Sequence, residues 1–512
     1  MVFLLLAGYR GGASGKLLVL ILAVLSLLEY RFLVHPLFHG RLSHIPGPWL
    51  SKIPSLNLAL YDLRVCRNDQ ILKWHRRYGP IVCIAPNEIS VTTRAATREI
   101  YGSSNKWAKS NYFDNFTGYN EERSVFATKP YEEHREKRRL TSTFYQASTI
   151  YKLPEIEKRI QDRIQAVVAQ ISPGKDVDIY NLTSWYVLDN ITYLILGPKY
   201  GTQSVEQPCL ERKILQELKH LQFFGPIRTH FSTIFTHISS ILGRVYPCLS
   251  YLQADRKLEE WFQGRLCATI NDPALYTFHS LLRCLVQIHK NGGSKPLDYK
   301  FIAVEGLDNI NAAVTTVAVT VTYLVWQLIQ HPKWQQRIHE ELRTLSMQTD
   351  GLVCFNDVNT QASVLEACLR EVYRFHPPSS GRAERVVPDG GCNLLGFYLP
   401  GETVVTTSVV GLHQNEIIFP EPEEFRPERW LEGDELSLKV RDAQLIPFGY
   451  GGRVCPGKPL ATMEIKMLIA APYLRYKTTM TAFSSAESMK QSSTFDAVPK
   501  ALKCIIAFSG RK

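Results

Sequence analysis

The sequence predicts a mainly α-helical protein with small β-sheets, preceded by one N-terminal transmembrane helix. Helical periodicity of the apolar residues dominates from about residue 150 to 345. Alternating β-branched residues from Ile81 to Thr92 are typical of strands. The segment from Gly381 to Val405, punctuated by Gly-Gly and Pro-Gly pairs, returns to strand and turn.

The N-terminal run is predicted to anchor the chain in a membrane. Residues 17–34 are mostly apolar, interrupted by Ser26, Glu29 and Arg31. As a helix this run would be about 27 Å long, close to the thickness of the hydrocarbon core of a bilayer. A cleaved signal peptide is the alternative, but no small-x-small cleavage site follows the run.

Length and composition allow one large globular unit after the anchor. The chain has 512 residues, of which 45% are hydrophobic. The stiff segment Ile45–Trp49 contains two prolines around a glycine and marks the boundary between two parts. We therefore divide the chain into an anchor with its linker, residues 1–44, and one domain, residues 45–512.

Cysteine usage and charge exclude several classes of protein. The eleven cysteines are odd in number and form no C-x-x-C pair, which argues against a disulfide framework and a zinc site and favours a reducing compartment. The net charge is +11, but no nucleic-acid motif accompanies it, so we expect no nucleic-acid partner. A basic body suits membrane lipid or an acidic electron-donor protein.

The most informative segment is a glycine-rich loop around one cysteine, Phe448–Gly457, which we call the cysteine loop. Its glycines allow sharp turns and a close approach of the backbone to a flat ligand. A helical run follows, and Pro456 suits its first turn, so we expect Cys455 at the positive end of a helix, where a thiolate is favoured. Such a thiolate can serve as an axial haem ligand; the alternative is a buried structural cysteine.

The cysteine loop resembles the haem-binding signature of the cytochrome P-450 superfamily, F-x-x-G-x-R-x-C-x-G. Its fixed places are filled by Phe448, Gly451, Arg453, Cys455 and Gly457. The order of the predicted elements is also similar to the P-450 fold from about residue 45 onward. The resemblance implies haem b as cofactor, Cys455 as the ligand of its iron, and Phe448 and Arg453 beside it.

Two further elements carry the resemblance. Glu371 and Arg374 share a helix face, and Arg429 belongs to a Pro-Glu-Arg-Trp segment. They are similar to the E-x-x-R and P-E-R-W elements of the family. An isolated surface pair of this kind is common and contributes only about 0.3–0.5 kcal/mol. The resemblance implies instead a buried network of these three residues that holds the haem loop.

Four cationic side chains are candidates for binding the haem propionates. Arg453 lies two residues before Cys455, and Arg385 opens the segment after the Glu371 helix. His134 and Arg138 are four residues apart and share a helix face. The family usually has tryptophan and arginine there, so Arg138 fits the pattern and His134 departs from it. His134 is equally consistent with a partly buried histidine that has a backbone partner.

A helix over Leu307–Gln330 is apolar nearly all round and must be buried. Counting back from Pro332, the catalytic alcohol of the family falls at Thr316. The similar-looking segment Glu305–Asn309 misses that register by roughly two turns. Thr315 occupies the place of the usual acid. The resemblance implies that Thr316 assists proton delivery, with Thr315 as a second hydroxyl; alternatively, Thr316 only bonds the carbonyl four residues back.

Three segments are expected to line the substrate pocket or the path to it. They are the aromatic-rich loop Ser103–Tyr131, the short segment Ser379–Gly381 and the turn Phe223–Pro226. Aromatic residues more often form ordinary packing, so these segments identify no substrate.

As a whole, the resemblance implies a membrane-anchored monooxygenase similar to fungal enzymes of secondary metabolism. It would insert one atom of O₂ into an apolar small molecule. Electrons would come from NADPH through a separate flavoprotein, NADPH–cytochrome P-450 reductase, because the chain has no flavin or nicotinamide domain. The implied location is the endoplasmic reticulum membrane, with the catalytic domain in the cytosol.

Two alternative functions stay open. The missing acid before Thr316 leaves open a haem-thiolate isomerase or peroxide-using enzyme, and a non-catalytic haem protein is the third possibility.

Overall fold

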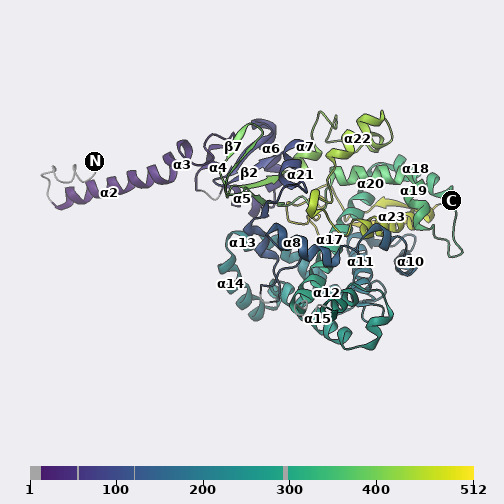
Figure 1. Ribbon diagram of the computed structural model, residues 1–512. Coiled ribbons are helices and arrows are strands. Elements are labelled where there is room, and N and C mark those ends of the chain that lie inside the picture. Colours follow the sequence, from purple (N-terminus) through teal and green to yellow (C-terminus); the bar gives the residue numbers. More distant parts are fainter. Residues whose placement is uncertain (1–12, 55–56, 120, 292–297, 512) are drawn as a thin grey trace.

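The computed structural model describes residues 13–54, 57–119, 121–291 and 298–511. Helices make up most of the body, and the strands β2 (Glu88–Val91) and β7 (Phe397–Leu399) lie toward the side from which an N-terminal helix projects (Figure 1). This confirms the predicted fold class. Residues 1–12 of the predicted anchor segment lie outside the described part of the chain.

The N-terminal helix is longer than its apolar core. It comprises α2 (Ala13–Glu29), a π-helical segment η1 (Tyr30–Val34) and α3 (His35–Phe38). Residues 17–38 are long and apolar enough to cross a membrane, and most of this span is exposed, although Pro36 near its end is buried. The predicted helix over residues 17–34 is therefore confirmed and continues one turn further.

The body is mainly helical, as the periodicity of residues 150–345 predicts. Its α-helices are α4 (Trp49–Lys52), α5 (Asn57–Leu63), α6 (Arg67–Tyr78), α7 (Arg94–Tyr101), α8 (Tyr131–Thr141), α9 (Ala147–Ile150), α10 (Pro154–Ala169), α11 (Ile179–Leu196), α12 (Leu210–Leu221), α13 (Gly225–His230), α14 (Ser232–Val245), α15 (Ala254–Ile270), α16 (Leu281–Asn291), α17 (Tyr299–Gln330), α18 (Pro332–Arg343), α19 (Phe355–Gln361), α20 (Ser363–Phe375), α21 (Val409–His413), α22 (Glu435–Gln444) and α23 (Lys458–Arg475). Short 3₁₀ helices are η2 (Asn111–Phe116), η3 (Gln222–Phe224), η4 (Pro247–Gln253), η5 (Pro273–Thr277), η6 (Pro427–Trp430) and η7 (Gly451–Arg453).

The strands form three small sheets. They are β1 (Ile81–Ala85), β2 (Glu88–Val91), β3 (Ala108–Lys109), β4 (Asp176–Asp178), β5 (Arg385–Val386), β6 (Cys392–Leu394), β7 (Phe397–Leu399), β8 (Val404–Thr407), β9 (Tyr476–Met480) and β10 (Ile505–Gly510). The sheet orders are β1-β2-β8-β5-β3, β4-β10-β9 and β6-β7. The predicted strands around residues 81–92 share the five-stranded sheet with β5 and β8, whereas β6 and β7, which also lie within residues 381–405, pair only with each other. Its β3–β5 pair places Lys109 opposite Arg385.

Helix α17 runs through the core of the body. It extends over 32 residues, starts eight residues before the predicted Leu307 and ends at Gln330, as predicted from Pro332. This helix is also long and apolar enough to cross a membrane, but 72% of its apolar stretch is buried inside the body. Because many of its residues are β-branched, packing against neighbours such as α11 supplies the stability that propensity does not.

Candidate active site

The cysteine loop leads directly into α23. The backbone N–H of Cys455 donates to the carbonyl of Phe448 at 2.9 Å, which closes the loop. Helix α23 begins at Lys458 and has Pro459 in its first turn. The predicted helix entry at Pro456 is therefore wrong by two residues. Cys455 nevertheless lies just before the N-terminus of α23.

One glycine of this loop is required by the neighbouring backbone. Gly451 has φ +73°, a region that side-chain-bearing residues rarely adopt. A Cβ atom at this position would also overlap the carbonyl oxygen of Tyr101 at the end of α7. The close approach that requires glycine here is thus to α7 rather than to a ligand.

The Cys455 thiol has two opposing influences on its protonation. Its side chain is accessible to solvent, yet many protein atoms surround it, and this crowding raises the pKa of the thiol. The backbone N–H groups of Gly457 and Lys458, and the positive charge of Arg138, lower the pKa. Burial raises this pKa more than the two N–H groups and Arg138 lower it, so the thiolate that the helix end is expected to favour stays a prediction. A metal cation at the sulfur would reverse this balance.

A fully buried network behind the loop centres on Glu371 of α20. Its carboxylate accepts two hydrogen bonds from Arg374, at 3.0 and 2.7 Å, and one from Nε of Arg429 at 3.3 Å. The indole N–H of Trp430 and the backbone N–H of Arg426 complete the shell, both at 2.9 Å. The predicted three residues therefore do meet in a buried network. Trp430, whose hydrogen bond sequence reasoning missed, is a fourth member.

This network extends to the base of the cysteine loop. Arg374 donates to the carbonyl of His413 at 3.3 Å, and the His413 ring accepts from the backbone N–H of Ile446 at 2.9 Å. Burial lowers the pKa of His413 to about 3, which keeps its ring neutral and able to accept. Ile446 lies two residues before Phe448, so the Glu371 network holds the start of the loop.

The structure brings the four predicted cations together and adds a fifth, Lys109. Burial, and after it the neighbouring cations, lower the pKa of Arg453 to about 9 and that of His134 to about 3. Burial and Arg385 also hold the pKa of Lys109 well below its usual value. Arg138 donates to the carbonyl of Val454 at 3.0 Å, beside the cysteine.

These five cations fit a ligand that carries two carboxylates. Within the described ranges, none of them forms an ion pair with an acidic side chain of the protein. The Nε of Arg453 is buried without a hydrogen-bond partner, and the His134 ring has no partner among the described residues. Because like charges repel when buried together, an anionic ligand would stabilise this cluster. Haem propionates would supply such charges, with Cys455 as the candidate ligand of the iron.

The two threonines of α17 face different surroundings. The Thr316 hydroxyl donates to the carbonyl of Ala312 at 2.8 Å, four residues back, which matches the alternative considered from the sequence. This bond uses its proton and leaves the oxygen able to accept. Thr315 instead lines a cavity. Cys455 of the cysteine loop and Glu305 of α17 both act electrostatically on Arg138. This indicates that α17 lies near the cysteine loop.

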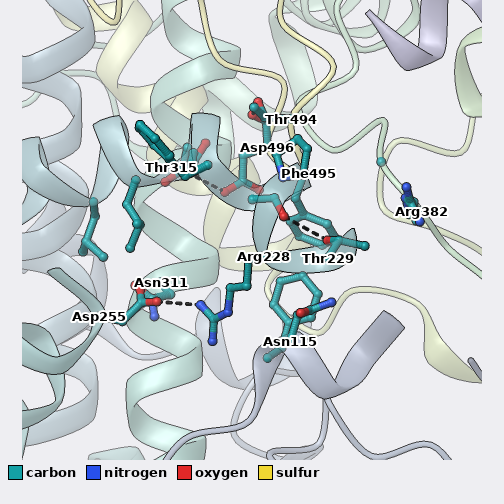
Figure 2. A pocket seen from close by; sticks show the side chains of 18 of the residues that line it. Asn115, Arg228, Thr229, Asp255, Asn311, Thr315, Arg382, Thr494, Phe495 and Asp496 are labelled. Carbon is teal, nitrogen blue, oxygen red and sulfur yellow. Dashed lines mark hydrogen bonds and ion pairs between the residues drawn. The ribbon is translucent and has the colours of Figure 1, made fainter. Parts of the chain in front are cut away.

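The cavity lined by Thr315 has a volume of about 300 Å³. Figure 2 shows Asn311 and Thr315 of α17 together with Thr494, Phe495 and Asp496 of the segment before β10. The segments expected from the sequence contribute in part, through Tyr112 and Phe116, Gly381, and Phe224 to Pro226. Sequence reasoning missed the 494–496 segment, because no motif marks it.

The comparisons with known proteins agree with this geometry. Residues 53–503 match the family model described as Cytochrome P450. Cytochrome P450 monooxygenase FGM1 of Gibberella zeae is 36% identical over 512 residues, which cover 98% of both chains. The identities are 28% for Cytochrome P450 monooxygenase orf2 of Aspergillus niger, over 86% of both chains, and 26% for BOT1 of Botryotinia fuckeliana, over 87% of both chains. The resemblance seen in the cysteine loop is thereby confirmed: the chain belongs to the cytochrome P450 family, as a P450 monooxygenase.

Proposed function

We propose that this protein is a membrane-bound haem-thiolate enzyme that inserts one oxygen atom from O₂ into a largely apolar small molecule of fungal secondary metabolism. Electrons come from NADPH through a separate flavoprotein reductase. The observation that carries the proposal is the position of Cys455 beside a cluster of basic side chains that form no ion pair with acidic residues in the described part of the chain. The fungal origin of the related monooxygenases supports the metabolic setting.

Haem, when bound, supplies the activation of O₂; the side chains supply its position, the substrate pocket and the protons. Arg385, Arg453 and their neighbours would hold the propionates, and Cys455 would provide the sulfur ligand for the iron. The Thr316 oxygen accepts a hydrogen bond from a water molecule, while the Thr315 hydroxyl faces the cavity. These hydroxyls hold and pass protons without a carboxylate between them.

Reductase-driven turnover with ¹⁸O₂ tests this function, and Thr316→Ala is the informative variant. Removing the hydroxyl should keep haem binding but lower the product formed per NADPH roughly tenfold, because proton delivery slows. The released hydrogen peroxide should rise correspondingly. Both quantities are measured in the same reaction, with the product identified by mass spectrometry after incubation with extracts of the producing fungus.

Thr315→Ala is the matched control and should be milder, because neighbouring residues of a helix point about 100° apart. Equal coupling in the parent and in Thr316→Ala would contradict the assigned register. A product that lacks ¹⁸O and forms without the reductase would favour the isomerase alternative. A product that forms with hydrogen peroxide alone would favour the peroxide-using alternative.

Membrane association is supported by a second apolar surface besides the N-terminal helix. Ile234, Ile238, Ile241 and Val245 are exposed along one face of α14. Contacts lead from the anchor to this face through α3, α4, α5, α13 and α14 in turn. In Figure 1, α13 and α14 lie on the side of the body from which α2 projects. We propose that both surfaces bind the endoplasmic reticulum membrane, with the catalytic domain in the cytosol.

Deleting residues 1–40 should move only part of the protein to the soluble fraction, because the α14 face remains. Adding Ile238→Glu and Ile241→Glu should release most of the rest, since both isoleucines are exposed. Ile417→Glu is the control, because Ile417 is exposed on another part of the chain and should change nothing. The distribution of the protein between the membrane and soluble fractions is measured after alkaline carbonate extraction. If the full-length gene product were recovered with a mature N-terminus beyond Glu29, a signal peptide would have been cleaved instead.

A further inference from the structure

Helix α7 packs against the cysteine loop at both of its ends. At its start, the guanidinium carbon of Arg94 lies 4.1 Å from the centre of the Tyr450 ring in the loop. At its end, the carbonyl oxygen of Tyr101 lies so close to Gly451 that a Cβ atom there would overlap it. The position of the loop backbone therefore depends on α7.

Tyr101 also connects α7 to the five-stranded sheet. Its phenol oxygen accepts a hydrogen bond from the backbone N–H of Thr407 in β8, at 2.9 Å. The hydroxyls of Thr97 and Thr407, which lie 3.3 Å apart, form a second link between the same two elements. Because Tyr101 is only 9% exposed, water competes little for these contacts.

The ring of Tyr101 contacts Arg385, one of the cations assigned to the haem propionates. The centre of the ring lies 4.9 Å from the guanidinium carbon. Strand β5 carries Arg385 beside β8, where it pairs with Val405. A guanidinium within about 6 Å of an aromatic ring centre is attracted by the negative face of the ring. Since Arg385 is buried, this contact stabilises a charge that has lost much of its water.

The hydrogen bonds of Arg385 leave part of its guanidinium for a ligand. Its Nη1 donates to the backbone carbonyls of Glu384 at 2.8 Å and Ala383 at 3.3 Å. Within the described ranges, its Nε and Nη2 donate to no protein group. The two carbonyls and the Tyr101 ring therefore hold the side chain, and the remaining N–H groups can bind a carboxylate.

We propose that Tyr101 is a positioning residue for the haem, which holds the cysteine loop and Arg385 in a fixed relative position. Its backbone carbonyl contacts the loop that carries the axial ligand, and its ring contacts the guanidinium that binds a propionate. This rests on the proposed function, since Cys455 and Arg385 are taken as haem contacts. One residue thus links two haem contacts that are 70 residues apart in the chain.

A general contribution to stability is the alternative role, because removal of any buried aromatic side chain destabilises a protein. The two roles differ in how they depend on the propionate charges. Haem b and its dimethyl ester have the same ring and iron, but the ester lacks both carboxylates. A residue that acts through Arg385 should affect the retention of haem b and leave that of the ester nearly unchanged.

The experiment measures how fast each of the two haems leaves the loaded full chain for an excess of serum albumin. Tyr101→Leu removes the ring and keeps the backbone carbonyl. It should speed the loss of haem b about tenfold and that of the ester less than twofold, because the contact with Arg385 is gone. In an Arg385→Ala background, Tyr101→Leu should have no further effect on haem b, since residues that act through one another are not additive. Tyr101→Met, which keeps more volume, serves the same comparison if the leucine variant does not fold.

Two further variants separate positioning from stability. Tyr101→Phe keeps the ring and should retain haem b like the parent, although Thr407 loses its acceptor. Tyr473→Leu removes another buried tyrosine, whose hydroxyl lies 2.9 Å from that of Thr478, and should speed the loss of both haems equally.

Equal acceleration for haem b and the ester in Tyr101→Leu, or additive effects with Arg385→Ala, would overturn the positioning role. The reduced carbon monoxide complex of the parent is recorded separately. The lack of a thiolate-type band in that complex would contradict the proposed function instead, so the two failures are distinguishable.

Discussion

Replacing Cys455 with serine should abolish the absorption band that is typical of thiolate-ligated haem in the reduced carbon monoxide complex. Serine has nearly the same shape, and the hydrogen bond from the backbone N–H of residue 455 to Phe448 does not involve the side chain. The loop should therefore keep its conformation. A hydroxyl, however, is far less acidic than a thiol and does not provide the anionic sulfur that this chemistry needs. Turnover with the reductase should be lost with the band.

The control for this experiment is another cysteine of the same chain. Cys248 is exposed, and its replacement by serine should leave the spectrum and turnover unchanged. Haem content and the far-ultraviolet circular dichroism of the Cys455→Ser variant show whether the protein has folded. A folded, haem-containing variant with an unchanged thiolate band would end the assignment of Cys455 as the ligand.

The second large effect is expected on stability. Glu371→Ala should destabilise the protein by about 3–5 kcal/mol, because it leaves two buried arginines without their carboxylate. Arg374 has no exposed side-chain surface, and Arg429 is nearly as buried. Trp430 would lose its hydrogen-bond acceptor as well. Since the network also reaches the cysteine loop through His413, haem retention should fall together with the unfolding midpoint in denaturant.

A surface carboxylate supplies the comparison for Glu371. Glu435 forms an ion pair with Lys439 at 2.6 Å, but both side chains are largely exposed. Its replacement by alanine should change stability by only about 0.3–0.5 kcal/mol. The midpoint and the bound haem are measured on the same samples during denaturation. Retention of both in Glu371→Ala would mean that the network does not hold the loop.

The cysteine loop and the end of α17 are the parts of the site that sequence reasoning predicted best. Local chemistry decides both: the spacing of glycines around Cys455, and a proline that cannot continue a helix at residue 332. The same local reasoning placed the N-terminal helix and the strands near residue 81. It erred at Pro456, where the loop takes two more residues before α23 begins.

Several contributors to the site depend on residues that are distant in sequence. Lys109 joins the cation cluster because β3 pairs with β5, and no local pattern predicts that pairing. The 494–496 segment reaches the cavity because its backbone bonds to residue 378, through the N–H of Ala497. The register from Pro332 placed Asp308 about two turns before the catalytic alcohol, yet Asp308 lies on the cavity wall.

The sequence by itself predicted the family, the candidate ligand cysteine, the apolar N-terminal helix and the order of the elements, because each follows from residues close together in the chain. The tertiary structure alone decided which charges are paired. Arg228 and Arg382 of the cavity wall form ion pairs with acidic residues, whereas Arg453 forms none within the described part of the chain. Such pairing depends on how far apart two elements lie in space and on how much water is excluded around the charges. The spacing of residues along the chain gives neither quantity.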